Sequence, residues 1–274
     1  MFTSLLIALF AIVTADDITI SDATKDDGVL VHTVRSPYQT GETRIRVLQP
    51  EKLEKDKRYP VVYVLPVEAT TESRFGDGLA EVKKLDLANK HQVIFVSPTF
   101  SHLPWYADHP TKPEIRQETY LLKVVVPHIE KTYPVKAEAN SRLLLGFSKS
   151  GWGAFSLLLR NPKVFGKAVA WDAPLMMDAP GKYGSGEIFG TAENFAGFRV
   201  SKLLENQGAA LGKESRLILL GYGNFRAEVQ QAHTLMEKAK VPHEYRDGPS
   251  RKHDWHSGWV AEAAELLLAP MKKD

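Results

Sequence analysis

The chain carries a series of short, almost continuously apolar runs, with segments of helical periodicity between them. A strand buried on both faces of a parallel sheet has this composition, because neither of its faces meets water. Strands that alternate with helices pack as an α/β structure with right-handed crossovers. The pattern therefore predicts a mostly parallel central sheet with helices on both faces. The apolar runs span residues 59–66, 92–97, 141–146, 166–171 and 216–221.

Three further kinds of segment complete this layout. Residues 28–34 and 43–48 alternate between apolar and polar side chains, which predicts an antiparallel hairpin ahead of the parallel strands. Residues 177–208 are rich in Gly and Ala with little periodicity, so we expect a loop-rich excursion above the sheet, suited to a substrate lid. Pro127 predicts a kink or break in its helix. Helices are expected at 114–132, 152–159, 226–240 and 259–268.

The composition suits one globular domain, which we place at residues 16–274. The chain has 274 residues, 43% of them hydrophobic and 25% charged. Its formal net charge is only +2, and Lys and Arg are scattered along it. This distribution argues against a nucleic-acid partner, which requires clustered basic residues. A small neutral or weakly charged partner is therefore expected.

The first residues have the pattern of a cleaved leader. An apolar run from Leu5 to Val13 leads into Val13-Thr14-Ala15, a small-residue pattern of the kind that signal peptidase cuts. We therefore predict a signal peptide at 1–15 and a secreted or periplasmic protein. The run is shorter than the roughly 20 residues of a transmembrane helix, so no membrane span is expected in the mature chain. The alternative is a buried N-terminal strand or helix, but the adjacent Asp16 and Asp17 favour cleavage.

The chain has no cysteine. Disulfides, thiolate metal sites and a cysteine nucleophile are therefore excluded. The cluster His253-Asp-Trp-His256 could be read as metal ligands. Two imidazoles three residues apart in a loop, with no further spaced ligand, are a poor zinc motif, so we expect neither a metal nor a cofactor.

A serine motif joins the apolar run at 141–146 to a helix. Gly146-Phe-Ser148-Lys-Ser150-Gly151 places Ser148 at a strand-to-helix turn, with small residues two before and two after it. Such a turn is strained, projects the hydroxyl and leaves no room for bulky neighbours. Ser148 is therefore the candidate nucleophile. Ser150 is disfavoured because Trp152 stands two residues after it, and the non-catalytic alternative is a turn that only caps the helix.

The candidate base follows the last strand. His253 lies in a loop after a short strand that begins near His243, which gives the order of serine, acid and histidine typical of α/β-hydrolases. His256 is the rival histidine.

Taken together, these motifs resemble the esterase family of α/β-hydrolases that includes esterase D, feruloyl and acetyl-xylan esterases and the mycolyltransferases. The resemblance covers roughly residues 59–268 and implies an α/β-hydrolase fold, with Ser148 as nucleophile and His253 rather than His256 as base. The segments that carry it are Tyr59-Pro-Val-Val-Tyr-Val-Leu, Trp105-Tyr-Ala-Asp108, Glu118-Thr-Tyr-Leu-Leu, Gly146-Phe-Ser-Lys-Ser-Gly-Trp-Gly-Ala, Pro242-His-Glu-Tyr-Arg and His253-Asp-Trp.

The chain departs from this family at the oxyanion hole. Relatives follow the apolar strand with His-Gly, where this chain has Pro66-Val67-Glu68. The hole needs a main-chain N–H and tolerates any side chain that leaves it free. Val67 is therefore one expected donor, with Glu68 close behind it, and the residue after the nucleophile, Lys149, is the other.

The triad acid is the second departure. Relatives carry Asp or Glu just after the strand that ends here at Gly221, but this chain reads Tyr222-Gly-Asn224. Asp172, after the preceding strand, is the preferred substitute, and its alternative role is a helix N-cap. Glu228, one turn into the next helix, and Asn224, which could orient an imidazole without charge, remain open.

Aromatic residues near the strand ends suggest a substrate pocket. Rings with polar edges suit sugars and aryl acids, so we expect Trp105, Tyr106, Asp108 and Trp152 to line the acyl or alcohol site, although each could equally be ordinary packing. Together with export, this favours a carbohydrate-linked acetyl or feruloyl ester. The expected activity is serine ester hydrolysis through an acyl-enzyme. The alternatives are an acyltransferase with the same triad and a non-catalytic binding protein on a hydrolase scaffold.

Overall fold

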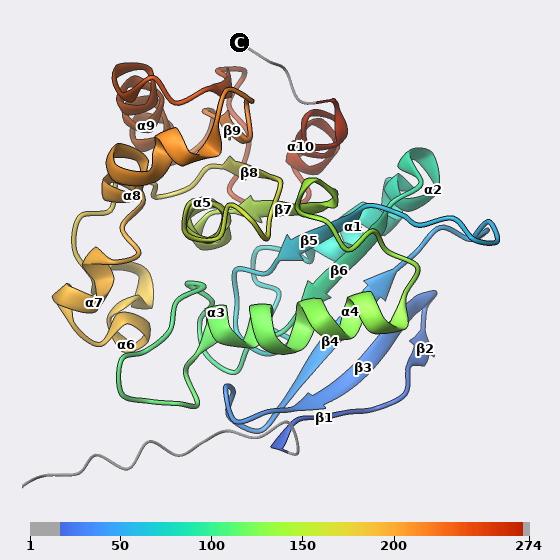
Figure 1. Ribbon diagram of the computed structural model, residues 1–274. Helices are drawn as coiled ribbons and strands as arrows, with labels where there is room; N and C mark the ends of the chain where they lie inside the picture. The colour runs from blue at the N-terminus through green and yellow to red at the C-terminus, as the bar shows by residue number, and fades with distance from the viewer. Residues whose placement is uncertain (1–16, 271–274) are drawn as a thin grey trace, which may run out of the picture.

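The computed structural model describes residues 17–270, and the predicted signal peptide at 1–15 lies outside them. A ten-stranded sheet runs through the molecule in the order β1-β3-β4-β6-β5-β7-β8-β9-β10, with β2 paired to β3 (Figure 1). The antiparallel part consists of β1 (Thr19–Ile20), β2 (Thr24–Asp26), β3 (Val29–Arg35) and β4 (Glu42–Leu48). The parallel part consists of β5 (Val61–Leu65), β6 (Ile94–Pro98), β7 (Arg142–Phe147), β8 (Lys167–Trp171), β9 (Leu217–Leu220) and β10 (His243–Arg246).

The parallel strands are the apolar runs of the sequence, and the predicted mostly parallel sheet is confirmed. Every residue of β5, β6, β8 and β9 is buried, because helices cover both faces of the sheet. The predicted hairpin is the antiparallel β3–β4 pair. Antiparallel pairing of β4 with β6 then joins this hairpin to the parallel strands.

Helices on each face enclose a separate apolar core. One face is covered by α3 (Gln117–Tyr120), α4 (Val126–Thr132), α5 (Lys149–Arg160), α6 (Gly186–Phe189), α7 (Ala192–Ala196), α8 (Val200–Gln207) and α9 (Arg226–Ala239). The other face is covered by α1 (Gly78–Lys84), α2 (Leu87–His91) and α10 (Trp259–Leu268).

The helix is not broken at Pro127. It contains a wider π turn just before the proline and continues beyond it. A π turn over Leu121–Val125 joins α3 to α4, and the Val126 N–H donates to the Leu121 carbonyl. Proline lacks the N–H that an α-helical turn would use, and the π turn ahead of it accommodates its ring. The helix therefore passes the proline without ending.

The expected loop-rich excursion at 177–208 contains more helix than its sequence suggested. It folds into α6, α7 and α8 after a short 3₁₀ turn at Lys182–Gly184. Aromatic packing stabilises these short helices, since Phe189 lies edge-on to Phe195 and to Trp152 of α5. Such contacts come from distant positions in the chain, so the local sequence does not indicate them.

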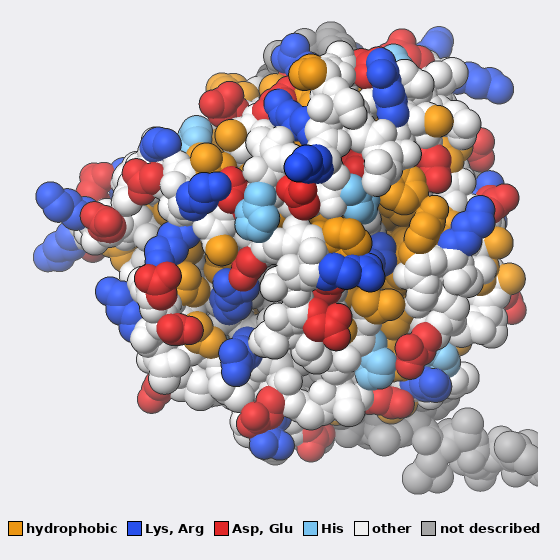
Figure 2. Space-filling view, turned by 180° about the vertical axis from the view of Figure 1, so that it is seen from behind, with side chains coloured by type: hydrophobic (Ala, Val, Ile, Leu, Met, Phe, Trp, Pro, Cys, Tyr) orange, Lys and Arg blue, Asp and Glu red, His pale blue; other side chains and the backbone are white. Residues whose placement is uncertain are grey.

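The surface seen from behind carries Lys and Arg intermingled with Asp and Glu, without a broad area of one sign (Figure 2). Within residues 17–270, no helix combines the length and the apolar character that crossing a bilayer demands.

Candidate active site

The strand register brings three predicted site segments to one edge of the sheet. Leu65 of β5 pairs with Gly146 of β7, and Phe147 of β7 pairs with Trp171 of β8. The residues that follow these strands therefore emerge side by side at their carboxyl ends. Ser148 and Asp172 directly follow β7 and β8, and Val67 is the second residue after β5. This is the edge where α/β folds bind ligands.

Ser148 occupies the tight turn that its neighbours predicted. Its backbone has φ 53° and ψ −126°, a conformation rare for a residue with a side chain. A Cβ atom at Gly146 would lie 2.2 Å from the Ser150 carbonyl oxygen, so only glycine fits there. The Ser150 hydroxyl is fully buried and donates to the Phe147 carbonyl at 2.9 Å. Ser150 is thus held within the turn, and Ser148 faces the cavity described below.

Ser148, His253 and Asp172 form a continuous hydrogen-bonded chain. The Ser148 Oγ lies 3.1 Å from His253 Nε2, and His253 Nδ1 lies 2.5 Å from Asp172 Oδ2. A carboxylate at Nδ1 fixes the tautomer in which Nε2 has a free lone pair facing the serine hydroxyl. The rings of Phe75, Phe147 and Phe225 surround the imidazole, with centroids 4.6–5.6 Å away. The arrangement can transfer a proton from the hydroxyl to the imidazole.

The structure brings Asp172, and not the other two acid candidates, to the histidine. The Asp172 carboxylate has no exposed surface, and its Oδ1 accepts the Phe225 N–H at 2.6 Å. Glu228 turns away to accept the Met176 N–H at 3.0 Å, and burial raises the pKa of its carboxyl. Asn224 is exposed and lines the cavity mouth.

His256 points toward α1 instead of the serine. Its Nδ1 lies 3.0 Å from the buried Glu81 carboxylate. A Cβ atom at Gly76 would lie 2.2 Å from His256 Nε2, so this imidazole packs directly on the loop that precedes α1. The rival histidine therefore has a structural partner.

Two main-chain N–H groups border Ser148 without a partner of their own. Among residues 17–270, the N–H groups of Val67 and Lys149 hydrogen-bond to no other atom. The Tyr106 hydroxyl donates to the Pro66 carbonyl at 2.6 Å, which fixes the peptide plane that carries the Val67 N–H. Such unpaired donors beside a nucleophile can stabilise a developing oxyanion.

Lys149 as a whole residue is only 7% exposed. Burial lowers the pKa of its ammonium, and the nearby Glu68 opposes that shift.

A cavity of about 660 Å³ opens over Ser148 and His253. Apolar and aromatic side chains form most of its wall, and the charged Arg74 and Lys149 stand among them. Its lining residues are Arg74, Phe75, Leu103, Ser148, Lys149, Pro174, Tyr183, Asn224, Phe225 and His253. Tyr183, half exposed, belongs to the segment expected to serve as a lid, and its ring lies edge-on to Phe225.

The four residues expected to line this cavity lie elsewhere, so that prediction is corrected. Trp105, Tyr106 and Trp152 have no exposed surface and belong to the core beneath the site. Asp108 accepts the Thr119 N–H at 3.0 Å and thereby holds the first turn of α3. The three aromatic rings pack between α5, α6 and the sheet. A sequence motif at a strand end does not show whether such a ring packs in the core or lines a binding cavity.

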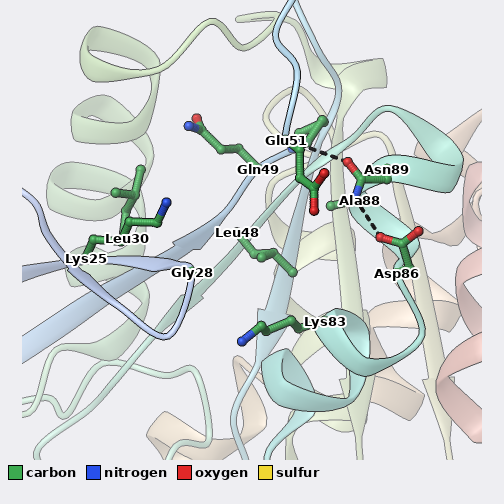
Figure 3. A pocket seen from close by; sticks show the side chains of 11 residues that line it. Lys25, Gly28, Leu30, Leu48, Gln49, Glu51, Lys83, Asp86, Ala88 and Asn89 are labelled. Carbon is green, nitrogen blue, oxygen red and sulfur yellow. Dashed lines mark hydrogen bonds between the residues drawn. The ribbon is translucent and has the colours of Figure 1, made fainter.

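A second cavity, of about 340 Å³, lies at the opposite end of the sheet (Figure 3). Leu48, Asp86 and Asn89 line it, and Leu48 pairs with Phe95 near the start of β6. The Asn89 side chain accepts the Glu51 N–H through Oδ1 and donates to the Asp86 carboxylate through Nδ2 (Figure 3). Lysines and loop backbone complete this cavity, which contains no candidate nucleophile and base pair.

Comparison with protein families finds one match. A family model described as Putative esterase matches residues 36–181, which include Ser148 and Asp172. No curated protein matches the chain.

Solved structures share the fold over nearly the whole chain. A ferulic acid esterase is 22% identical, with 90% of this chain and 96% of that chain covered and a TM-score of 0.68. An S-formylglutathione hydrolase from Staphylococcus aureus is 16% identical, with 88% and 98% covered and a TM-score of 0.69. A ferulic acid esterase from Anaeromyces mucronatus, solved with ferulic acid, is 18% identical, with 92% and 97% covered and a TM-score of 0.59. The likeness confirms the predicted α/β-hydrolase fold.

Proposed function

Since this chain belongs to the putative esterase family and is a serine ester hydrolase, we propose that Ser148 is its nucleophile, His253 its base and Asp172 its acid. The observation that supports this assignment is the chain of contacts of 3.1 Å and 2.5 Å from Ser148 through His253 to Asp172. The strained backbone at Ser148 adds to it, since strain of this kind concentrates at functional sites.

The mechanism follows from the hydrogen-bonded chain of Ser148, His253 and Asp172. His253 Nε2 takes the Ser148 proton as Oγ attacks the ester carbonyl carbon, and Asp172 stabilises the imidazolium that forms. The N–H groups of Val67 and Lys149 donate to the oxyanion of the tetrahedral intermediate. The imidazolium then protonates the departing alkoxide, which leaves an acyl group on Ser148. Water, deprotonated by His253, attacks this acyl-enzyme, and the His253 imidazolium returns the proton to Ser148 Oγ as the acid leaves.

Replacement of the nucleophile tests the assignment. Ser148→Ala should lower kcat for a p-nitrophenyl ester by about 10⁴-fold or more, because the hydroxyl forms the covalent intermediate. Labelling by a fluorophosphonate probe should disappear with it. Ser150→Ala is the matched control, since Ser150 lies in the same turn but its hydroxyl hydrogen-bonds to Phe147, and this variant should still be labelled.

Retention of hydrolysis and labelling in Ser148→Ala would overturn the assignment. A wild-type chain that the probe does not label would contradict the proposed activation of Ser148 by His253. Diversion of the acyl group to an added alcohol would support the acyltransferase.

The cavity wall favours an aryl acyl group over acetyl. A volume of about 660 Å³ far exceeds what an acetyl group fills, and the rings of Phe75, Tyr183 and Phe225 offer stacking surfaces to a planar acid. A feruloyl-type ester linked to a carbohydrate fits this wall, with the sugar toward the open mouth. Export, which the pattern at 1–15 predicts, would bring the enzyme to such polymers, and N-terminal sequencing of the mature chain tests it.

Comparison of two esters tests the acyl preference. The kcat/KM for methyl ferulate should exceed that for methyl acetate, and Tyr183→Ala should lower the former at least tenfold, because the exposed ring contributes apolar contact area. The rate for methyl acetate serves as the internal control and should change little. A preference for acetate, unchanged in Tyr183→Ala, would contradict the aryl assignment while leaving the triad intact.

A further inference from the structure

A second cluster of chemically active side chains lies between α9 and β10, outside the candidate active site. His233 and Glu237 stand four residues apart on α9, so they share one face of the helix. The chain then turns back, and His243 at the start of β10 meets them. One ligand atom from each of the three residues lies within 4.8 Å of the other two.

The ring nitrogens of His243 have distinct partners. Nδ1 lies 2.7 Å from the Val241 carbonyl, to which it can only donate, so Nε2 is left with a lone pair. That nitrogen faces His233 Nδ1 at 2.8 Å and the Glu237 carboxylate at 3.7 Å. Histidines that bind metals are commonly held in this way, with one N–H on a backbone carbonyl and the other nitrogen toward the ion.

The rest of the cluster is also arranged for a ligand. The His243 side chain is 3% exposed and therefore fixed by packing, and the His233 ring stacks on Tyr245 at 4.1 Å between centroids. Glu237 is 66% exposed, so its carboxylate can rotate toward an ion. Zinc binds histidine nitrogens at about 2.0–2.1 Å, which would move the two nitrogens apart from 2.8 Å to about 3.3 Å. A shift of this size needs only small ring rotations.

We propose that His233, Glu237 and His243 form a binding site for a divalent transition metal ion of the zinc class. Two imidazoles and one carboxylate suit Zn²⁺, Co²⁺ or Ni²⁺, whereas Ca²⁺ and Mg²⁺ require mostly oxygen ligands. A water molecule would supply the fourth ligand of the ion, because Glu237 lies on the surface.

The position of the cluster indicates a structural role. His243 pairs with Leu217 at the start of β9, at the opposite end of the sheet from Ser148. Among the residues that the structure describes, β10 is an edge strand and pairs only with β9. An ion shared by α9 and β10 would fasten this edge, from which the chain continues through residues 247–252 to His253.

Metal titration of the full chain, without a histidine tag and after chelator treatment, tests the site. Calorimetry should show one Zn²⁺ per chain, Co²⁺ should give the visible absorption of a nitrogen-ligated ion, and Zn²⁺ should raise Tm with its concentration. Loss of outer-shell partners typically lowers metal affinity about 10- to 100-fold. Glu237→Gln and His233→Gln, which remove ligands directly, should therefore weaken binding at least tenfold and abolish the Tm increase.

Two choices keep this test decisive. Both replaced side chains lie partly or largely at the surface, so the variants should fold, which Tm without metal verifies. His91→Gln, in α2 on the other face of the sheet, is the matched control and should bind Zn²⁺ like the wild type. Absence of one-to-one binding, or equal affinity in Glu237→Gln, His233→Gln and wild type, would overturn the proposal.

Discussion

At the scale of single residues, Gly223 and Asp172 share one small space beside His253. A Cβ atom at Gly223 would lie 2.5 Å from Asp172 Cγ, so the carboxylate fills the space where a side chain at 223 would stand. Asp172 itself adopts φ 43°, which turns its carboxylate over β9 toward His253. Gly223 therefore leaves the space that the carboxylate of Asp172, the proposed acid, occupies.

Removal of the charge at position 172 should expose its role. Asp172→Asn should lower kcat/KM for a p-nitrophenyl ester by about 10²- to 10⁴-fold, because the amide neither stabilises the imidazolium nor enforces its tautomer. Glu228→Gln is the control, since the amide oxygen can still accept the Met176 N–H. Steady-state kinetics on both variants checks this, and equal rates in Asp172→Asn and wild type would exclude Asp172 as the acid.

At the scale of elements, a buried carboxylate connects α3 to the end of α5. Glu118 of α3 accepts from Arg160 at the end of α5 at 2.9 Å, and from Asn161 at 2.6 Å. The same guanidinium donates to the Gly197 carbonyl and lies over the Phe198 ring. Because α5 begins directly after Ser148, these contacts hold the helix that follows the proposed nucleophile.

Loss of this arginine should destabilise the fold without touching the site. Arg160→Ala should lower the free energy of unfolding by about 1–3 kcal/mol, since it leaves Glu118 largely buried with fewer partners. The matched control is Arg35→Ala, whose pair with Glu42 is more than half exposed and should contribute less than about 1 kcal/mol. Urea unfolding measures both variants. Equal losses of unfolding free energy would show that the Glu118 contacts stabilise the fold no more than an exposed ion pair does.

At the scale of the whole molecule, a histidine cluster joins the antiparallel strands to the helices of one face. His32 of β3 hydrogen-bonds through Nε2 to the Tyr133 hydroxyl at 2.7 Å. The His128 ring of α4 lies edge-on to His32 at 4.5 Å between centroids. Burial, with a smaller effect of His32, lowers the pKa of His128 to about 4. The neutral form of His128 is therefore the one that the folded protein accommodates.

This pKa predicts a loss of stability in acid. Between the ordinary value of 6.5 and about 4, the unfolded chain binds a proton at His128 that the folded chain does not. Stability should therefore fall as the pH is lowered through this window, and His128 should add no pH dependence above it. Urea unfolding at pH 7 and pH 4.5 should show a smaller loss for His128→Gln than for wild type, and identical losses would contradict the assignment.

Much of this architecture was predictable because it depends on local patterns. Short apolar runs separated by helical segments predict strands buried on both faces, and β5 to β9 follow them. The turn at Ser148 was predictable for the same reason, since small residues at 146 and 150 are a local steric requirement. The helices α6 to α8 escaped prediction because contacts with Trp152 and other distant residues stabilise them.

The sequence by itself determined the strand order along the chain, the serine turn and the identity of a candidate histidine, because each rests on neighbouring residues. Only the tertiary structure decided which carboxylate faces His253, which aromatic rings border the cavity, and that His233, Glu237 and His243 meet. Helical spacing places His233 and Glu237 on one face of α9, but it does not show which side chain of another segment meets them. Strand register and helix packing decide those distances.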